Sequence, residues 1–389
     1  MTLRWPVRGL FGLVFLGVLW WLDVGPRQAP LPPMQAAVSV RAVAADLPSL
    51  QKDAAGFLPM ATDALTAHAS NLLAMPQGHT ATLTAFWFSG DRESAPNVQI
   101  AASQFDRASQ TWLPARNVVD RIAVAQKLGF GVRRLGNPVG WLDTDGRMHL
   151  FVVGTGAGGW AAARILHLVQ SSEQSDLAHL SFVPVNVLPL SWLWNTSFLV
   201  RNSPLQLADG GMLLPVHFEL GWKYPAAVRF DAHGNFVGMV RISAGHHLLQ
   251  PTLVVESPTQ WRALMRSQAP ERRIGQAVSD DAGQHWHDVP ALPMANPDSA
   301  LQTLSLNSNT HLLVHNSTPQ DRSVLDLSRS TDAQSWQLET HLMQGGDKDE
   351  YSYPSLAYAD GAVWVSYTDH RKHIAWQRFV PKPGQGAKP

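Results

Sequence analysis

Polar and titratable side chains recur at the ends of short apolar segments in this sequence. Such segments begin at His68, Asn137, Asn202, Gln250, Asn296 with Ser299, and Tyr351 with Tyr353, and a second polar set follows the next apolar segments: Asp91, Arg92, His217, Glu219, Arg266, His315, Asn316, Asp369, His370 and Arg371. Arginine pairs bidentately with carboxylates, whereas tyrosine, histidine and acidic side chains transfer protons. Brought together, these groups would bind an acidic substrate and act on it.

A repeated hairpin pattern accounts for the placement of these side chains. Each copy is an apolar segment, a turn such as Asp143-Thr144-Asp145-Gly146, and a second apolar segment. The copies start near Asn71, Asn137, Asn202, Gln250, Ala300 and Tyr353, roughly 45 to 70 residues apart. That spacing is typical of the four-stranded blades of a β-propeller. Since the innermost strands of such blades line a central channel, we expect the polar side chains to form a ring at one of its mouths.

A turn motif recurs behind the hairpins. The segment from Ser279 to Trp286 (SDDAGQHW) fits the pattern S-x-D-x-G-x-x-W, while STDAQSW (330–336) is one residue shorter and DRASQTW (106–112) is a weaker copy. Short Asp and Ser side chains satisfy turn amides, glycine adopts positive φ, and tryptophan packs between neighbouring elements. The motif, including Asp281 and Trp286, therefore marks a fold and not a catalytic site.

The hairpins and the turn motif together resemble the sialidase-like family of Asp-box (BNR) repeat proteins. The matching stretches include GNPVGWLDTDGRMHLFVVG, LLQPTLVV, the Asp-box itself and EYSYPSLAYADGAVWVSYTDHRKHI, and the resemblance covers about residues 67 to 380. It implies an all-β fold, a six-bladed β-propeller over residues 46–382, with a carbohydrate site over the central axis. Residues 383–389 would form a flexible tail.

The N-terminus has the pattern of a membrane-targeting segment. Arg4 and Arg8 precede the apolar run from Gly9 to Leu22, and no small-x-small cleavage site follows promptly. This pattern favours an uncleaved signal-anchor over residues 1–24 and a Pro/Ala-rich linker over residues 25–45. The propeller would then lie in the periplasm or outside the cell, attached to the inner membrane. Secretion after signal cleavage is the alternative.

The resemblance also implies roles for individual residues. Sialidases bind the substrate carboxylate with three arginines and use a tyrosine nucleophile, activated by a glutamate, with an aspartate as general acid/base. Here Arg266 and Arg371 resemble two of the arginines, Tyr351 the nucleophile with Tyr353 as its rival, and Glu219 the activating base. The aspartate nearest to an acid/base position is Asp91. The substrate-binding ring would comprise Arg266, Arg371, Arg92, His68, Asn137, Gln250, Asn296, Tyr353 and His217.

The sequence departs from the sialidase pattern at the first arginine. The Phe-Arg-Ile-Pro segment is missing, and the matching region reads Ala67-His68-Ala69-Ser70-Asn71, so Arg92 would have to substitute from a loop. Two alternatives to a glycosidase stay open. His68, His217, Tyr351 and Arg266 around a uronic acid would suit a polysaccharide lyase. Trp87, Trp160, Trp192, Trp194 and Trp222 would serve a glycan-binding or assembly propeller without catalysis.

Composition excludes several other classes. Lys+Arg and Asp+Glu both number 30, which argues against a nucleic-acid partner. The sequence has no cysteine and no HExxH-like spacing of histidines, so neither a metal nor another cofactor is expected. The glycine-rich segment 154–159 (GTGAGG) follows a hairpin strand without a βαβ pattern, so it is interpreted as a loop over the propeller mouth and not as a phosphate site.

Overall fold

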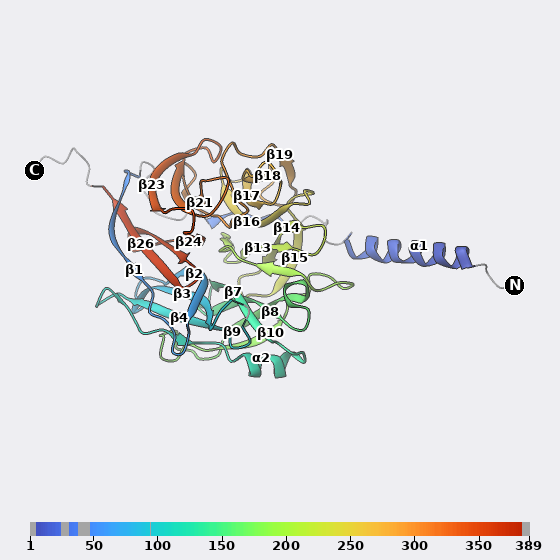
Figure 1. Cartoon of the computed structure of the whole chain (residues 1–389), viewed down its shortest axis with the longest axis horizontal. Coiled ribbons are helices and arrows are strands. Elements are labelled where there is room, and N and C mark those ends of the chain that lie inside the picture. The colour runs from blue at the N-terminus through green and yellow to red at the C-terminus, as the bar shows by residue number, and fades with distance from the viewer. Residues whose placement is uncertain (1–4, 25–30, 38–46, 94, 383–389) are drawn as a thin grey trace, which may run out of the picture.

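The computed structural model describes residues 5–24, 31–37, 47–93 and 95–382, and its strands form six sheets around a central channel (Figure 1). We number these sheets as blades along the chain and list their strands from the axis outward. Blade 1 contains β2 (Thr66–Ala74), β3 (Ala81–Gly90), β4 (Gln99–Asp106), β5 (Thr111–Trp112) and β6 (Arg116–Asn117); blade 2 contains β7 (Arg134–Leu142), β8 (Met148–Thr155), β9 (Ala163–Gln170) and β10 (Phe182–Val187). The predicted six-bladed all-β propeller is confirmed.

The remaining blades follow the same order. Blade 3 contains β11 (Phe198–Val200), β12 (Leu205–Gln206), β13 (Met212–Phe218), β14 (Tyr224–Phe230) and β15 (Phe236–Arg241); blade 4 contains β16 (Leu248–Val255), β17 (Trp261–Ser267), β18 (Gly275–Ser279) and β19 (His287–Val289); blade 5 contains β20 (Gln302–Asn307), β21 (Thr310–Asn316), β22 (Val324–Ser330) and β23 (Gln337–Gln344). Neighbouring strands within a blade are antiparallel, so every innermost strand runs in one direction along the axis.

Blade 6 closes the ring by joining the two ends of the propeller. It contains β24 (Tyr351–Ala359), β25 (Ala362–Asp369) and β26 (His373–Pro381), and its outermost strand is β1 (Leu50–Phe57). The register of β1 against β26 runs from Leu50 opposite Pro381 to Phe57 opposite Ala375. This pairing satisfies the outer edge of the last sheet and fixes the ends of a closed structure.

Four of the innermost strands carry a β-bulge at the same height. The register shifts occur beside Ala69, Asn137, Gln250 and Tyr353, which have φ values of 53°, 44°, 49° and 53°. Left-handed backbone is uncommon for residues with a Cβ, and bulges re-aim side chains at sheet ends. The bulges therefore turn side chains toward the axis at one end of the channel.

The Asp-box forms the turn that its sequence predicts. Asp281 Oδ1 accepts a hydrogen bond from the backbone N–H of His285 (2.8 Å), Ser279 Oγ accepts one from Gly283 (2.8 Å), and Trp286 Nε1 donates to the carbonyl of Gly283 (3.0 Å). In the shorter copy, Trp336 Nε1 donates to Ala333 in the same way. These residues lie at the β18–β19 and β22–β23 turns, away from the channel, which agrees with a structural role.

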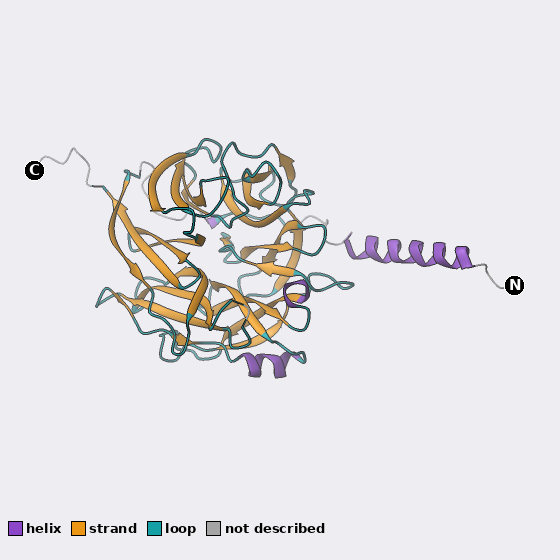
Figure 2. Cartoon of the chain, viewed as in Figure 1, coloured by secondary structure: helices purple, strands orange, loops and turns teal. Residues whose placement is uncertain are grey.

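The described segments at the N-terminus include a helix and, at residues 31–37, a short segment that we call the strap. Helix α1 (Trp5–Val24) projects from the propeller with exposed apolar side chains, including Phe15 and Trp21 (Figures 1 and 2). Among the described residues, no helix has the length and apolarity that crossing a bilayer requires. The predicted anchor is thus not confirmed, and the location of the protein stays a prediction.

Residues 31–37 form the strap, which lies between blades 3 and 4. Leu31, Met34 and Ala36 are buried there, and the carbonyl of Gln35 accepts a hydrogen bond from the backbone N–H of Ala208 (2.8 Å). Part of the predicted linker is therefore packed against the propeller, whereas residues 25–30, 38–46 and 383–389 lie outside the described residues.

Candidate functional site

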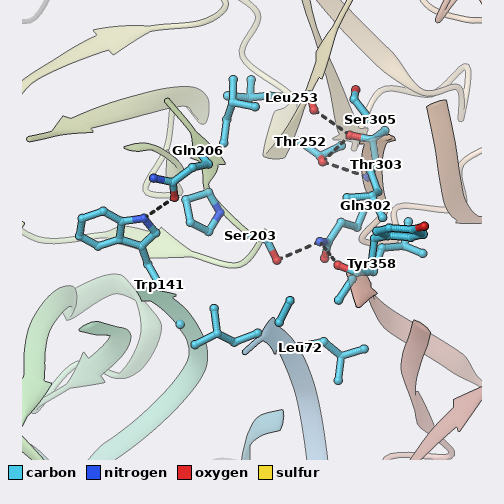
Figure 3. A pocket seen from close by; sticks show the side chains of 18 of the residues that line it. Leu72, Trp141, Ser203, Gln206, Thr252, Leu253, Gln302, Thr303, Ser305 and Tyr358 are labelled. Carbon is cyan, nitrogen blue, oxygen red and sulfur yellow. Dashed lines mark hydrogen bonds between the residues drawn. The ribbon is translucent and has the colours of Figure 1, made fainter. Parts of the chain in front are cut away.

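The interrupted innermost strand of blade 3 divides the channel into two halves. Between β11 and β12, Asn202 Nδ2 donates to the carbonyls of Gln250 and Pro251 (both 2.9 Å), and Ser203 Oγ accepts from Asn71 Nδ2 (2.9 Å). Ser203 Oγ also accepts from Gln302 Nε2 (2.9 Å), as Figure 3 shows. We call the half at the starts of the innermost strands the upper mouth, and the half toward their ends the lower cavity. The bulged residues all lie at the upper mouth.

Tyr353 occupies the centre of the upper mouth. Its ring lies edge-on to the ring of His68, with 4.5 Å between the ring centres, and 5.2 Å from the guanidinium carbon of Arg201. The charges of Arg266 and Arg371 also interact electrostatically with Tyr353. One phenol ring is thus surrounded by a histidine and arginines that come from blades 1, 3, 4 and 6.

Arg201 is a site residue that the sequence did not indicate. It is 1% exposed, and its Nη2 donates to the carbonyl of Pro354 (2.8 Å), but its Nε and Nη1 have no hydrogen-bond partner in the described part of the chain. Burial lowers the pKa of its guanidinium to about 10, so it remains charged at neutral pH. A buried cation with free donors is unfavourable unless an anion or water completes its hydrogen bonds.

Arg266 is held in place by two partners. Its Nε donates to Asp298 Oδ1 (2.6 Å) and its Nη1 approaches Gln250 Oε1 at 3.4 Å. Burial works against the charged form, but Tyr353, Asp298 and Glu219 together raise the pKa of Arg266 above its ordinary value. The predicted ring residues Arg266 and Gln250 therefore do come together at the mouth.

An ion-pair network closes one side of the mouth. Arg371 Nε donates to both carboxylate oxygens of Glu350 (2.9 and 3.1 Å), its Nη1 reaches Glu93 Oε2 (2.7 Å), and Arg322 Nη1 donates to Glu350 (3.0 Å). Burial alone would raise the pKa of Glu350, yet the two arginines hold it below its usual range. Arg371 is about half exposed, so a ligand can reach it.

His217 and Glu219 lie where the β13–β14 loop leaves blade 3. The distance from His217 Nε2 to Glu219 Oε2 is 3.8 Å, and both ring nitrogens of the buried His217 lack a hydrogen-bond partner among the described residues. His217 first, and Arg266 in addition, lower the pKa of Glu219, so its carboxylate is ionised at neutral pH. Glu219 therefore shares an electrostatic neighbour, Arg266, with Tyr353.

Buried His68 faces Tyr353 from blade 1. Burial first, and the charge of Arg371 next, lower its pKa to about 3. Its Nδ1 has no hydrogen-bond partner in the described structure. The residue that stands in place of the usual first arginine is therefore a neutral imidazole.

Several predicted residues lie away from the centre. Tyr351 is 6% exposed and packs in the hydrophobic core against Tyr367, and burial, followed by Asp349 and Asp369, raises the pKa of its phenol. Asn296 is buried in a turn, where its side chain bonds to Ser299. These positions favour structural roles, whereas Asn137 is at the mouth on its bulge.

The loop after β3 contains the two remaining predicted residues. Asp91 and Arg92 are both exposed, and the backbone N–H of Asp91 bonds to Asn97 Oδ1 (3.3 Å). Neither contacts Tyr353 or the mouth arginines in the described structure. The neighbouring Glu93 reaches Arg371 instead, so the loop borders the mouth without bringing Arg92 into it.

Six antiparallel blades with an arginine-rich mouth define a sialidase-like propeller. The model of the BNR repeat-like domain matches residues 81–365, and the chain belongs to this family. No curated protein matches by sequence.

Solved structures show the same fold at low sequence identity. A Hadza microbial sialidase is 14% identical (81% of this chain, 66% of that one, TM-score 0.63), and Trypanosoma rangeli sialidase is 12% identical (81% and 55%, TM-score 0.62). A protein of unknown function from Dyadobacter fermentans is 13% identical (86% and 100%, TM-score 0.63). The chain thus spans about two-thirds or less of the length of these sialidases.

Proposed function

We propose that the upper mouth binds an acidic sugar and that the protein is an exo-glycosidase of the sialidase type. The observation that carries this proposal is the set of arginines around Tyr353: Arg371 is about half exposed, and the buried Arg201 has no hydrogen-bond partner for Nε or Nη1 within the described residues. Nε–H and Nη1–H of a guanidinium are charge-assisted donors, which bind carboxylate oxygens more strongly than neutral donors do. The sialidase structures that share the fold support the same class of substrate.

Binding would precede the chemistry. Arg201 would donate hydrogen bonds to the substrate carboxylate, and Arg266 and Arg371 would add positive charge from blades 4 and 6. Since Asp298 and Glu350 already hold these two arginines, their side chains are oriented before a ligand arrives. Such preorganisation reduces the entropy lost on binding.

The reaction would then use Tyr353 as nucleophile. Glu219 takes the phenolic proton as the Tyr353 oxygen bonds to the anomeric carbon and the glycosidic C–O bond breaks, while an acid protonates the departing oxygen. Water then attacks the anomeric carbon, releases the sugar and regenerates the phenol. We retain Asp91 for the acid, because its loop borders the mouth through Glu93.

One observation favours a lyase as the second candidate. His68 is kept neutral by burial, has no hydrogen-bond partner at Nδ1 within the described residues, and touches the ring of Tyr353. A neutral imidazole next to a phenol is suited to removing the α-proton of a uronic acid while the arginines bind its carboxylate. In that reaction the leaving oxygen departs by elimination, without attack of water.

Two tyrosine variants distinguish these functions. The full chain is assayed with a fluorogenic sialoside and, separately, with uronate polysaccharides followed by the ultraviolet absorbance of unsaturated products. Tyr353→Phe should lower sialoside hydrolysis by roughly 10³-fold or more, because it removes the nucleophile. Tyr351→Phe is the matched control, since it removes the same hydroxyl from a core position.

The alternative outcomes assign the other functions. Loss of activity in Tyr351→Phe alone would move the nucleophile to the core position and contradict our assignment. An absorbance rise with uronates would identify a lyase. Glycan binding without either reaction would identify a binding propeller.

A further inference from the structure

The turn between β25 and β26 has an uncommon backbone conformation for its residues. His370 and Arg371 are its two central residues, with φ values of 52° and 55°. Across the turn, the backbone N–H of Lys372 donates to the carbonyl of Asp369 (2.9 Å). Tight turns with positive φ at both central positions are normally made by Asn and Gly, because a Cβ disfavours that conformation. Such local strain persists only where the surrounding contacts enforce it, and it occurs preferentially at functional sites.

His370 makes the contacts that hold this turn. Its Nε2 bonds to Asp349 Oδ1 (2.8 Å) in the loop before β24, and its Nδ1 bonds to Oδ1 of the neighbouring Asp369. Its backbone N–H also donates to the carbonyl of Glu350 (2.8 Å). We call the two imidazole bonds, to Asp349 and Asp369, the clamp. It joins the β25–β26 turn to the segment that enters β24.

Both carboxylates of the clamp favour a protonated imidazole. A histidine donates from both ring nitrogens only when it carries a positive charge. The hydrogen bonds to Asp349 and then to Asp369 raise the pKa of His370 above its ordinary value of 6.5, although burial acts in the opposite direction. The phenol of Tyr351 also faces the imidazole, with 5.3 Å between the ring centres. The charge of His370 is therefore lost only as the pH rises through this raised pKa.

The clamp lies beside an ion pair of the upper mouth. Arg371 directly follows His370 in the chain, and Glu350 directly follows Asp349. Arg371 Nε donates to both carboxylate oxygens of Glu350, so the two side-chain contacts link the same two backbone segments. The position of the Arg371 guanidinium therefore depends on the turn that His370 holds.

We infer that His370 is a positioning residue, which in its protonated form holds Arg371 in place for an acidic ligand of the upper mouth. Loss of the proton removes one bond of the clamp, because a neutral imidazole has a single donor. The turn then has fewer contacts to enforce its unfavourable backbone conformation. Affinity for an acidic sugar should accordingly fall as the pH rises. The inference rests on the proposed function for the ligand, but not for the contacts of the turn.

Isothermal titration of the full chain with sialic acid, at pH 6 and at pH 9, tests this inference. His370→Asn removes the charge but retains the turn, because asparagine adopts positive φ more readily than most residues with a Cβ. We expect the wild type to bind about 10-fold more weakly at pH 9 than at pH 6, and His370→Asn to have the lower affinity at both. His285→Asn is the matched control, because His285 forms another exposed ion pair, with Asp281 at the Asp-box turn.

Amide hydrogen exchange of the unliganded chain gives a measurement that needs no ligand. At pH 6, peptides covering residues 345–352 and 366–374 should exchange faster in His370→Asn than in the wild type, because the variant lacks the clamp. His285→Asn should leave exchange in both peptides unchanged.

The outcomes separate this inference from the proposed function. If exchange is unchanged in His370→Asn, or if the variant and the wild type bind sialic acid equally at both pH values, His370 does not position Arg371. If exchange rises in the variant but neither protein binds an acidic sugar, the clamp stands and the proposed function is overturned. If His285→Asn weakens binding as much as His370→Asn does, the effect does not come from the turn and the inference is wrong.

Discussion

The two halves of the channel differ in the charged and titratable groups that they leave without hydrogen-bond partners within the described residues. The lower cavity, about 400 Å³, is lined by leucines together with threonine, serine and glutamine. There, the hydroxyls of Thr252 and Thr303 bond to each other (2.8 Å) and Trp141 Nε1 donates to Gln206 Oε1 (2.8 Å), as Figure 3 shows. These bonds join neighbouring blades, so the lower half holds the ring together.

The upper mouth leaves charged and titratable groups without partners. Within the described residues these are Nδ1 of His68, Nε and Nη1 of Arg201, and both ring nitrogens of His217. Buried polar groups normally pair, and an orphaned donor costs about 1–3 kcal/mol. Three such residues lie at one end of the channel, where the proposed ligand would complete their hydrogen bonds. The difference distinguishes a half whose hydrogen bonds join the blades from the half to which we assign the proposed site.

The strap should have the largest effect on stability, because it completes the lower half of the molecule. Leu31 and Met34 are buried between blades 3 and 4, and Ala37 lines the lower cavity. Removing residues 1–37 should therefore lower the free energy of unfolding by about 3–6 kcal/mol, the sum of two buried side chains. Removing residues 1–30 should leave it unchanged. Urea unfolding of both truncations measures the difference, and equal stabilities would show that the strap does not hold the blades.

Arg201→Met should separate binding from stability at the upper mouth. Loss of the guanidinium should weaken binding of free sialic acid about 100-fold, equivalent to about 2.7 kcal/mol. The free energy of unfolding should change by less than about 1 kcal/mol, because an unpaired buried charge is removed along with one hydrogen bond.

Arg262→Met is the matched control for Arg201. Arg262 is also buried but pairs with Glu256 (2.5 Å) and Gln276 (2.7 Å) in blade 4. Its loss should reduce stability by about 3 kcal/mol and leave sialic acid affinity unchanged. Isothermal titration and urea unfolding of both variants measure these effects. A lower stability of Arg201→Met than of Arg262→Met would contradict the comparison.

The blades were predictable from sequence, because hairpins and Asp-box turns are encoded locally. Ser279, Asp281 and Gly283 satisfy one another within a few residues, and no distant part of the chain is needed to form that turn. The positions of Arg266 and Gln250 at the channel mouth were predictable from the same repeat. The strap was not predictable, since its Pro-rich composition is that of a linker and only tertiary packing buries it.

The site was less predictable because bulges and an interrupted strand decide it. In a regular strand Tyr351 and Tyr353 would face the same side. The bulge between Ser352 and Ser355 breaks this equivalence, leaving Tyr351 in the core and Tyr353 at the axis. The sequence gives no signal for Arg201, because β11 ends at Val200 and the repeat pattern indicates Asn202 as the channel residue.

Ser203 is the point where the two halves of the channel meet. Its hydroxyl accepts hydrogen bonds from Asn71 and Gln302, so Ser203→Ala leaves two amide groups short of an acceptor. We expect a loss of about 2 kcal/mol in the free energy of unfolding, measured with urea. Ser109→Ala, on an exposed turn, should change it by less than about 0.5 kcal/mol. Equal effects would mean that the central contacts add nothing to stability.

The smallest expected effect is the pH dependence that His68 gives to the upper mouth. Its pKa is about 3 in the folded protein, lowered by burial and by Arg371, against about 6.5 in an unfolded chain. As the pH falls below 6.5 the unfolded state takes up a proton that the folded state does not, so stability falls until pH 3. At pH 5 the loss from His68 is about 1–2 kcal/mol.

His68→Phe tests this dependence, since phenylalanine can pack against Phe88 and Tyr353 without binding a proton. The variant should lose less stability than the wild type between pH 7 and pH 5, as urea midpoints at the two values would show. His311→Phe is the control: burial lowers the pKa of His311 to about 4, and it lies in blade 5 away from the mouth. Both variants should make the free energy of unfolding less dependent on pH, but only His68→Phe should also alter binding of an acidic sugar. If both variants changed binding of the acidic sugar alike, the conclusion that the upper mouth binds this ligand through His68 would be wrong.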